Sequence, residues 1–338
     1  MITIKDIAKA ANVSPATVSR VLNNGPKVGA NKRAHVQKII DDLGYRPNLT
    51  ARALVKQSSG SIGVVIPEIF DPFMAKFAHE IESYATQHDV QTFISSGHND
   101  VEKEAMAINK LLDNNVRSII LHSKVMSDED IIHFSKIVPN LVLINRNIEV
   151  IKEKCFWVDN YAASFAITEH LINAGHTKFV YLNSNYDIED PKERFEGFKG
   201  ALKAHNIHLD FNIVEYAEPF HEGGSDAIQR IIKKDLTFTA IVAYNDQMAL
   251  GAINYLHEIG INTPKAVSVV GFDDVIYASN SIPKLSTMHY PITEMAIAAT
   301  TTAISEFIDS DIEKADIPHC FTPEIIDRDS VKTLTLAK

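Results

Sequence analysis

Residues 3–24 read TIKDIAKAANVSPATVSRVLNN, and this stretch contains the start signals of two short helices. Thr3 and Asp6 have the spacing of a capping box, in which a hydroxyl and a carboxylate bind free N–H groups of a first helical turn. Ser14 followed by Pro15 is typical of an N-cap and the first residue of a helix. The stretch therefore predicts a helix-turn-helix, a motif whose second helix contacts DNA bases.

The second predicted helix has two different faces. Val18, Val21 and Leu22 are expected to face the interior. Small, hydroxyl-bearing and basic side chains occupy the other face, and such groups suit base edges and phosphates. These outward residues are Ala16, Thr17, Ser19 and Arg20.

A third helix is indicated by four apolar residues at the spacing of one helix face. Gly44 follows as the terminating residue, and Pro47 lies just beyond it. Three short helices can close a minimal core, although a small helical bundle with another function would show the same signals. The four apolar residues are Val36, Ile39, Ile40 and Leu43.

Charge is distributed unevenly along the chain. The first 57 residues carry ten Lys and Arg against three acidic residues, a balance of +7, whereas the whole chain sums to −10. The remaining 281 residues are therefore near −17. A basic head on an acidic body indicates that one small module faces a polyanion, while the larger part does something else in solution.

Residues 48–57 are a candidate hinge. They are compatible with a helix capped by Asn48, but so short a helix is not stable alone, and its folding should depend on a partner. The alternative interpretation is a flexible linker that contains one incidental leucine, Leu54.

After residue 60 the pattern changes to short β-branched runs that alternate with longer amphipathic stretches. This alternation is typical of β-α units around parallel sheets. About 280 residues is long for a single domain of this kind. The predicted strands are 62–66, 92–95, 118–121, 141–144, 179–182, 240–243 and 267–270.

Sequence motifs of common enzyme classes are missing. There is no G-x-G-x-x-G dinucleotide loop and no phosphate loop ending in Gly-Lys. Three His-Glu pairs, at 79–80, 221–222 and 257–258, lack the second His of a helical zinc site, so ordinary histidines are the better interpretation. Two cysteines are too few for a disulfide framework and fit a reducing cytosol, and no signal peptide or long apolar run is present.

The opening stretch and YRPNLTARAL at 45–54 resemble the DNA-binding head and hinge of the lactose and galactose repressor family. Four further motifs resemble the galactose-repressor and isorepressor branch more than the purine or lactose branches. They are LHSKVMSDEDI at 121–131, LVLINR at 141–146, YNDQMALGA at 244–252 and GFDDV at 271–275.

The resemblance implies a three-part chain of mixed α/β class. A helix-turn-helix domain is expected over 1–47, a hinge helix and linker over 48–60, and an effector-binding and dimerisation domain over 61–338. The body should resemble periplasmic binding proteins, with two doubly wound parallel-sheet subdomains. Their expected bounds are about 61–160 with 290–320 and about 161–289 with 321–338, so the chain would cross near Asn160, Tyr290 and Cys320.

The resemblance also implies the residues that contact DNA. Leu54 matches a leucine that enters the minor groove at a central step and kinks the duplex. Pro15 departs from the branch, which usually has a β-branched residue there, so the operator is expected to be related but not identical. Thr3, Thr17 and Ser19 are assigned to phosphates and Arg20 to guanine. The full DNA-binding set is Thr3, Ser14, Pro15, Ala16, Thr17, Ser19, Arg20, Asn23, Asn48, Ala51 and Leu54.

Effector-contacting positions of the family match residues at the ends of predicted strands, where open parallel sheets bind ligands. Arg194 offers a planar fork of donors, Asp273 an acceptor pair and Asn245 both kinds, which together suit a hydroxylated ring. Further matching positions are Asp71, Phe73, Asn145 and Arg146, with Phe73 able to cover an apolar sugar face and Phe220 as an additional candidate.

Each of these residues also has a purely structural interpretation. Arg194 and Asp273 would form an ion pair between surface helices, Phe73 would belong to the core, and Asp246 would merely cap the helix that follows Asn245.

The function implied by the resemblance is a cytoplasmic bacterial repressor of sugar-utilisation genes, associated with the nucleoid when bound to its operator. It would bind a palindromic operator as a homodimer and be released by a sugar, with D-galactose as the first candidate. No enzyme activity, cofactor, metal or membrane partner is expected. The alternatives are a relative that answers to another sugar such as ribose or to a corepressor, a sugar-binding transport component, and a sugar-modifying enzyme.

Overall fold

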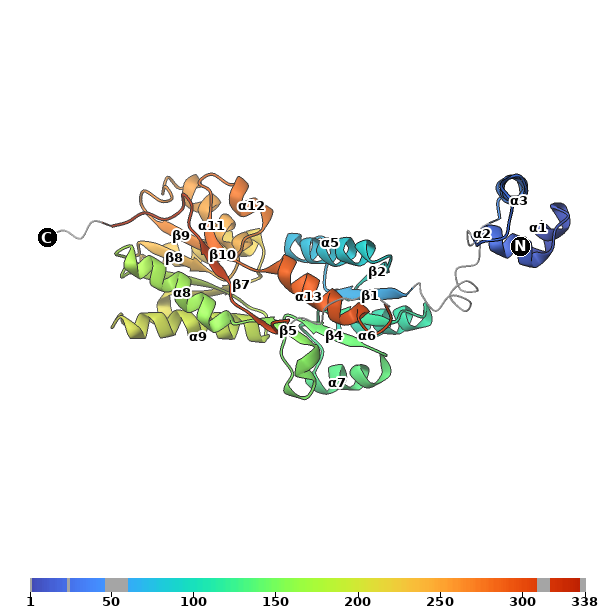
Figure 1. Ribbon diagram of the computed structural model, residues 1–338. Coiled ribbons are helices and arrows are strands. Elements are labelled where there is room, and N and C mark those ends of the chain that lie inside the picture. Colours follow the sequence, from blue (N-terminus) through green and yellow to red (C-terminus); the bar gives the residue numbers. More distant parts are fainter. Residues whose placement is uncertain (1, 23–24, 46–59, 309–316, 335–338) are drawn as a thin grey trace. The chain divides into compact units, whose positions relative to one another are not determined.

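Figure 1 shows a computed structural model of the chain, which describes residues 2–22, 25–45, 60–308 and 317–334. Contacts divide the chain into two compact units, Met1–Ser59 and Gly60–Lys338. The first is the helical head and the second is the α/β body.

The head contains the three expected helices, α1 (Ile4–Ala10), α2 (Pro15–Leu22) and α3 (Ala30–Asp42). Thr3 and Asp6 form the predicted capping box of α1. At the start of α2, the amide of Thr17 donates to Ser14 Oγ at 3.2 Å, as expected of an N-cap.

Seven apolar side chains from the three helices form the core of the head. Leu22 packs against this core with part of its surface exposed, in line with its expected inward placement. Leu43, the C-cap residue of α3, is exposed although it continues the apolar spacing of that helix. Gly44 takes a positive φ of 59°, which fits its predicted terminating role. The core residues are Ile7, Ala8, Ala11, Val18, Val21, Val36 and Ile40.

The first sheet of the body has the order β11-β5-β4-β3-β1-β2, and all its neighbouring strands run parallel. Helices α5 and α13 pack on one face, α6 and α7 on the other (Figure 1). The strands are β1 (Ser61–Ile66), β2 (Gln91–Ser96), β3 (Ser118–Leu121), β4 (Leu141–Ile144), β5 (Cys155–Val158) and β11 (Cys320–Phe321). The helices are α5 (Pro72–Gln87), α6 (Val101–Asp113), α7 (Asp128–Ile137), the 3-10 helix η1 (Glu149–Lys154) and α13 (Ile292–Ile304).

The second sheet has the order β12-β10-β9-β8-β6-β7, and only β12 runs antiparallel to its neighbour. Helices α8 and α9 cover one face, α10 and α11 the other. The strands are β6 (Phe179–Ser184), β7 (Val214–Ala217), β8 (Ala240–Ala243), β9 (Ser268–Asp273), β10 (Ser286–His289) and β12 (Glu324–Ile326). The helices are α8 (Asn160–Asn173), α9 (Glu189–Ala204), η2 (Phe211–Ile213), α10 (His221–Lys233), α11 (Asp246–Glu258) and α12 (Ile276–Asn280).

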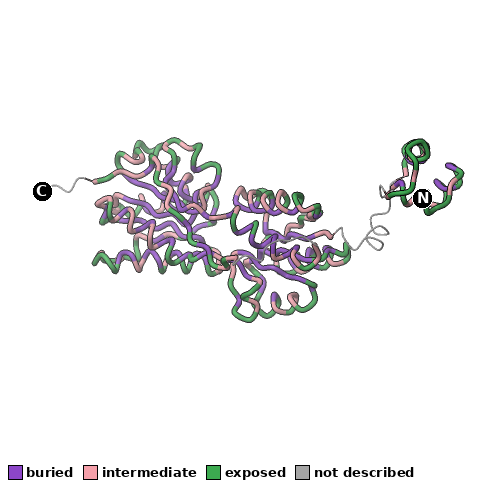
Figure 2. Tube along the Cα trace, viewed as in Figure 1, coloured by how far each residue is buried: buried purple, intermediate pink, exposed green. Residues whose placement is uncertain are grey.

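Helices cover both faces of each sheet, which explains why the central strands are buried and consist mostly of apolar residues (Figure 2). Val64 and Val65 in β1 belong to different apolar clusters because consecutive side chains of a strand point to opposite faces. One cluster is shared by the facing helices of both sheets, so the body has a continuous core.

All seven predicted strands are present, three with the predicted bounds and four with at least one end that differs by one to three residues. Five strands are not among the predictions: β5, β7, β10, β11 and β12. Strand β10 has the sequence STMH, in which Ser286 and Thr287 are buried and hydrogen-bonded through their side chains. Strand β7 lies at a sheet edge with two side chains partly or fully exposed. Neither strand shows the apolar run by which the others are predicted.

The chain passes between the two sheets three times. It leaves the first sheet after β5, returns after β10 through α13 to β11, and ends in the second sheet with β12. Among the described residues, none of the helices combines the length and the apolar character needed to span a bilayer.

Candidate functional site

A cleft of about 760 Å³ of empty volume, part of it open to solvent, lies at the carboxyl ends of the strands of both sheets. Loops after β1, β3 and β4 line it from the first sheet, and loops after β6, β7, β8 and β9 from the second. Seven of the eight predicted effector-contacting residues line this cleft. They are Asp71, Phe73, Asn145, Arg194, Phe220, Asn245 and Asp273.

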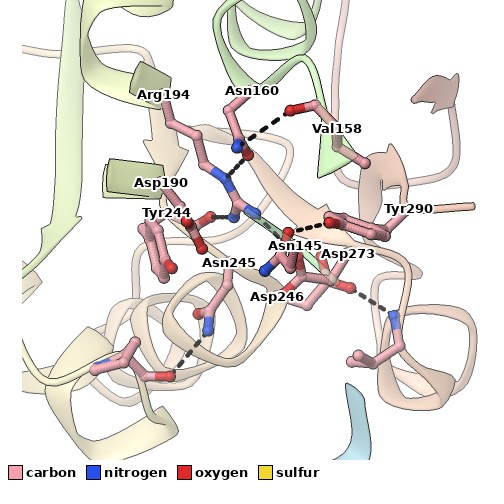
Figure 3. A network of polar contacts seen from close by, with 12 residues as sticks. Asn145, Val158, Asn160, Asp190, Arg194, Tyr244, Asn245, Asp246, Asp273 and Tyr290 are labelled. Carbon is pink, nitrogen blue, oxygen red and sulfur yellow. Dashed lines mark hydrogen bonds and ion pairs between the residues drawn. The ribbon is translucent and has the colours of Figure 1, made fainter. Parts of the chain in front are cut away.

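Arg194 on α9 is the centre of the polar network in the cleft (Figure 3). Its side chain is 4% exposed. Nε donates to Asn160 Oδ1 at 2.9 Å, and Nη1 donates to the carbonyl of Tyr244 at 2.7 Å. The guanidinium carbon lies 3.6 Å from the ring centroid of Phe272, so cation–π attraction adds to the hydrogen bonds that orient the group.

Asp273 ends β9 and faces Arg194, whose Nη2 lies 3.5 Å from its Oδ1. Burial raises the pKa of Asp273 to about 7, although the guanidinium opposes the shift. The two residues therefore do form an ion pair, but it lies in the cleft and not between surface helices. A carboxylate that is only weakly paired can accept hydrogen bonds from ligand hydroxyls.

Asn245 follows β8 and is the N-cap of α11. Its Oδ1 accepts from the amide of Met248 at 2.9 Å, and its Nδ2 donates to the carbonyl of Pro219 at 2.9 Å. The structural interpretation that Asp246 caps this helix is therefore wrong, because Asn245 does so. The carboxamide keeps one free N–H and one free lone pair for a ligand.

The wall contributed by the first sheet combines a carboxylate with aromatic rings. Asp71 caps α5 by accepting from the amide of Phe73 at 3.0 Å, and burial raises the pKa of Asp71. Phe73 packs edge-on against Tyr290 with ring centroids 4.9 Å apart, so it belongs to the core and lines the cleft at once. The Tyr290 hydroxyl donates to Oδ1 of Asn145, which has a positive φ of 61° at the end of β4.

The structure places Phe220 at the cleft and Arg146 outside it. Phe220 precedes α10 and lines the cleft with 36% of its surface exposed. Arg146 does not line this cleft: its guanidinium donates to the carbonyl of Met126 at 2.7 Å and to Asp128 Oδ1 at 2.5 Å. These bonds direct Arg146 toward the helix that follows β3.

The cleft also contains an ion pair that the sequence interpretation missed. Lys124 follows β3, Asp190 lies in the first turn of α9, and Nζ is 2.7 Å from Oδ2. Burial would raise the pKa of Asp190, but the ammonium of Lys124 and the guanidinium of Arg194 outweigh it and lower the pKa. Lys124 lies inside the quoted motif at 121–131, yet nothing in the sequence pairs it with a residue 66 positions away.

The head presents the predicted DNA-contacting surface only in part. Ala16 and Arg20 are exposed, and Thr17 and Ser19 are partly exposed on α2. Thr3 and Ser14 are exposed as well, but their hydroxyls take part in the caps of α1 and α2. Pro15 is exposed as the first residue of α2. Asn23, Asn48, Ala51 and Leu54 lie outside the described residues.

No cluster of three or more His, Cys, Asp or Glu suitable for a metal ion occurs in the described ranges. Cys155 is buried, Cys320 is exposed, and both are free thiols.

Head and cleft together define a class of protein: a DNA-binding transcription regulator whose body belongs to the sugar-binding type. Residues 3–48 match the model of the bacterial regulatory proteins of the lacI family, and residues 168–331 match that of the periplasmic binding protein-like domain. The chain belongs to the lacI family. Its relatives are regulators and not enzymes, so the expectation that this chain is not an enzyme is confirmed.

Two curated relatives cover nearly the full chain. The HTH-type transcriptional regulator GalR of Escherichia coli (strain K12) is 35% identical over 336 residues, which span 99% of this chain and 97% of that protein. The regulator GalS of Salmonella typhimurium (strain LT2) is 38% identical over 332 residues, which span 98% and 97%. A crystal structure of the lac repressor dimer bound to operator and the anti-inducer ONPF has the same fold, with a TM-score of 0.83 at 24% identity, over 98% of this chain and 99% of that one.

Proposed function

We propose that the protein represses sugar-utilisation genes by binding a near-palindromic operator as a homodimer, and that a sugar in the cleft releases it. D-galactose is the first candidate, because GalR and GalS are 35% and 38% identical to this chain over nearly its full length. The observation that carries the proposal is the cleft itself, where Arg194, Asp273 and Asn245 bring a donor fork, an acceptor pair and a carboxamide together.

The geometry of the cleft suits a hydroxylated ring. Neighbouring sugar hydroxyls need partners that both donate and accept, and the free groups of Asp273 and Asn245 supply these. Phe73 offers an apolar surface on the opposite wall, where a sugar presents its C–H face. Asp71, Asn145 and Phe220 are proposed as further contacts.

The head is proposed to read DNA through α2. Ala16, Thr17, Ser19 and Arg20 would face the major groove, with Arg20 as the guanine-contacting residue. We also propose that Asn23, Asn48 and Ala51 contact DNA, and that Leu54 enters the minor groove. Replacing Leu54 with Ala should weaken operator binding much more than sugar binding, and equal operator affinity would remove that role.

Regulation follows from thermodynamic linkage. If the sugar favours one arrangement of two subdomains and the operator another, each ligand must weaken binding of the other. We propose the subdomain bounds given above, about 61–160 with 290–320 and about 161–289 with 321–338. A marginal hinge over 48–57 would couple them to the head, because such a helix orders or melts for little free energy. A cytoplasmic location follows from this proposed role at DNA.

The test is fluorescence anisotropy of a labelled palindromic operator with a central CG step, titrated with protein at one fixed salt concentration. D-galactose and comparison sugars are then added. Release of the operator by galactose alone supports the full proposal. Release by ribose, or stronger binding with a corepressor, would mean that galactose is not the effector, whereas the proposed role as a transcription regulator would stand. Absence of selective binding to any candidate operator would contradict the role of the head.

A further inference from the structure

The loop that carries Asp273 has an unusual backbone. Asp273 has a φ of 107° and Asp274 a φ of 55°, and neither is glycine. A residue with a side chain in these regions costs about 1–3 kcal/mol and persists only when its surroundings hold it there. The residues that hold this loop therefore decide where the Asp273 carboxylate lies.

The side chain of Asp246 holds this loop in place. It is the first residue of α11 and is fully buried. Its Oδ2 accepts from the amide of Val275 at 2.8 Å, and its Oδ1 accepts from the hydroxyl of Thr287 on β10 at 2.5 Å. The first of these bonds is drawn in Figure 3. A Cβ on Gly271 would clash with the same carboxylate, so β9 packs too closely against Asp246 for any side chain at this position.

A second set of contacts holds the next residue of the loop. Asp274 accepts from Nη2 of Arg328 at 2.6 Å and contacts Nδ1 of His289 at 2.9 Å. Arg328 also donates to the carbonyl of Leu285 at 2.8 Å. The loop is thus held at Asp274 and Val275, and the side chain of Asp273 is left facing Arg194 and the cleft.

We propose that Asp246 is a positioning residue for the effector site, which acts on the ligand through Asp273. The inference rests on the proposed function, in which Asp273 binds sugar hydroxyls. Asp246 uses both oxygens on the protein, one for the loop that carries Asp273 and one for the strand beside β9. It thereby sets the distance between β9 and α11 and the direction of the loop that leaves β9.

The substitution Asp246→Ala tests this role. Alanine has no acceptor, so the Val275 amide and the Thr287 hydroxyl both lose their hydrogen-bond partner. Loss of these buried hydrogen bonds predicts a sugar dissociation constant raised roughly tenfold or more. Operator affinity without sugar should change by less than about twofold, because the change is confined to one side of the cleft.

A double-substitution cycle distinguishes positioning from a general loss of structure. Sugar binding is measured by calorimetry with D-galactose on the full chain, for the wild type, Asp246→Ala, Asp273→Asn and the double variant. If Asp246 acts through Asp273, the Asp246→Ala change raises the dissociation constant much less once Asp273 is already Asn. The same factor in both backgrounds would overturn the inference.

Ser330→Ala is the matched control. Ser330 is also fully buried in the second sheet, where its hydroxyl donates to the carbonyl of Val269 at 2.6 Å and accepts from the amide of Ser286 at 2.8 Å. Its loss should lower stability without touching the loop at Asp273. Sugar affinity reduced equally by Ser330→Ala and Asp246→Ala would assign the effect to sheet stability and overturn the inference.

A readout without sugar keeps this inference separate from the proposed function. Hydrogen–deuterium exchange of the peptide spanning 271–278 should accelerate in Asp246→Ala and stay unchanged in Ser330→Ala, with no ligand present. A wild-type chain that does not bind galactose would contradict the proposed sugar but not this result. Unchanged exchange in Asp246→Ala would overturn the positioning role.

Discussion

Lys124 and Asp190 join the two sheets of the body across the cleft, with Nζ 2.7 Å from Oδ2 and side-chain exposures of only 19% and 9%. The first residue follows β3 and the second begins α9, so the pair links elements that have no strand contact with each other. A buried charge depends strongly on its partner, because water can no longer solvate it.

Replacing Lys124 with Met should therefore lower the free energy of unfolding by about 3 kcal/mol, because the Asp190 carboxylate stays buried without its partner. The double variant Lys124→Met with Asp190→Leu should recover part of that loss, since two apolar side chains need no pairing. Urea unfolding of the three proteins measures both effects. A single variant as stable as the wild type would show that water reaches Asp190.

Replacing Arg194 with Lys should weaken sugar binding by roughly tenfold or more, because an ammonium cannot make the same planar set of bonds to Asn160, Tyr244 and Asp273. Operator affinity without sugar should be retained. Calorimetry with galactose gives the first quantity and operator anisotropy the second. Arg230→Lys is the matched control, since Arg230 pairs with Glu215 away from the cleft. Retained sugar response in Arg194→Lys would remove the guanidinium from the site.

Glu104 on α6 should make stability fall as the pH rises. It is fully buried, its Oε2 accepts from the Ser123 hydroxyl at 2.5 Å, and burial raises its pKa to about 7 from an ordinary 4.5. Between these values the folded state binds more protons than the unfolded state, so this contribution is present below pH 4.5 and is lost as the pH passes 7.

The substitution Glu104→Gln removes this titration and should raise the free energy of unfolding by about 1–3 kcal/mol at pH 8, with little effect at pH 4.5. Urea unfolding at several pH values measures the difference. Glu102→Gln, an exposed position of the same helix, should show no such trend. A constant difference across the pH range would mean that Glu104 stays ionised in the folded protein.

Arg20→Ala in the head should weaken operator binding by about 1–3 kcal/mol, which is the range for one bidentate contact to guanine. Arg20→Lys keeps the charge, so it should lose most of the sequence discrimination while retaining binding to random DNA. Anisotropy with operator and random duplexes at equal salt separates these effects. If Arg20→Lys binds the operator like the wild type, Arg20 contacts phosphate and not guanine.

The sequence alone predicts much of the secondary structure because the signals are local. The capping box at Thr3, the Ser14-Pro15 start of α2 and the left-handed Gly44 depend only on neighbours along the chain. The buried central strands are also visible, since both their faces are covered and most of their residues are apolar. Strand β10 is not visible, because the side chains of Ser286 and Thr287 are polar and are buried through hydrogen bonds to Asp327 and Asp246.

Family resemblance predicts which residues line the cleft, but it does not predict how they are arranged there. The Lys124–Asp190 pair joins residues far apart in the chain. Arg146 points away from the cleft because its guanidinium binds the Met126 carbonyl and the Asp128 carboxylate. Asn245, and not Asp246, caps α11, because the buried Asp246 carboxylate is already used by Val275 and Thr287.

The sequence by itself thus determined a basic helix-turn-helix head, a parallel α/β body and the residue types offered to a ligand. Only the tertiary structure decided which charges pair, which polar groups remain free and how the strained loop at Asp273 is held. The physical reason is range: helix caps and hydrophobic periodicity act over a few residues, whereas ion pairs and buried hydrogen bonds depend on distances that the folded chain alone sets.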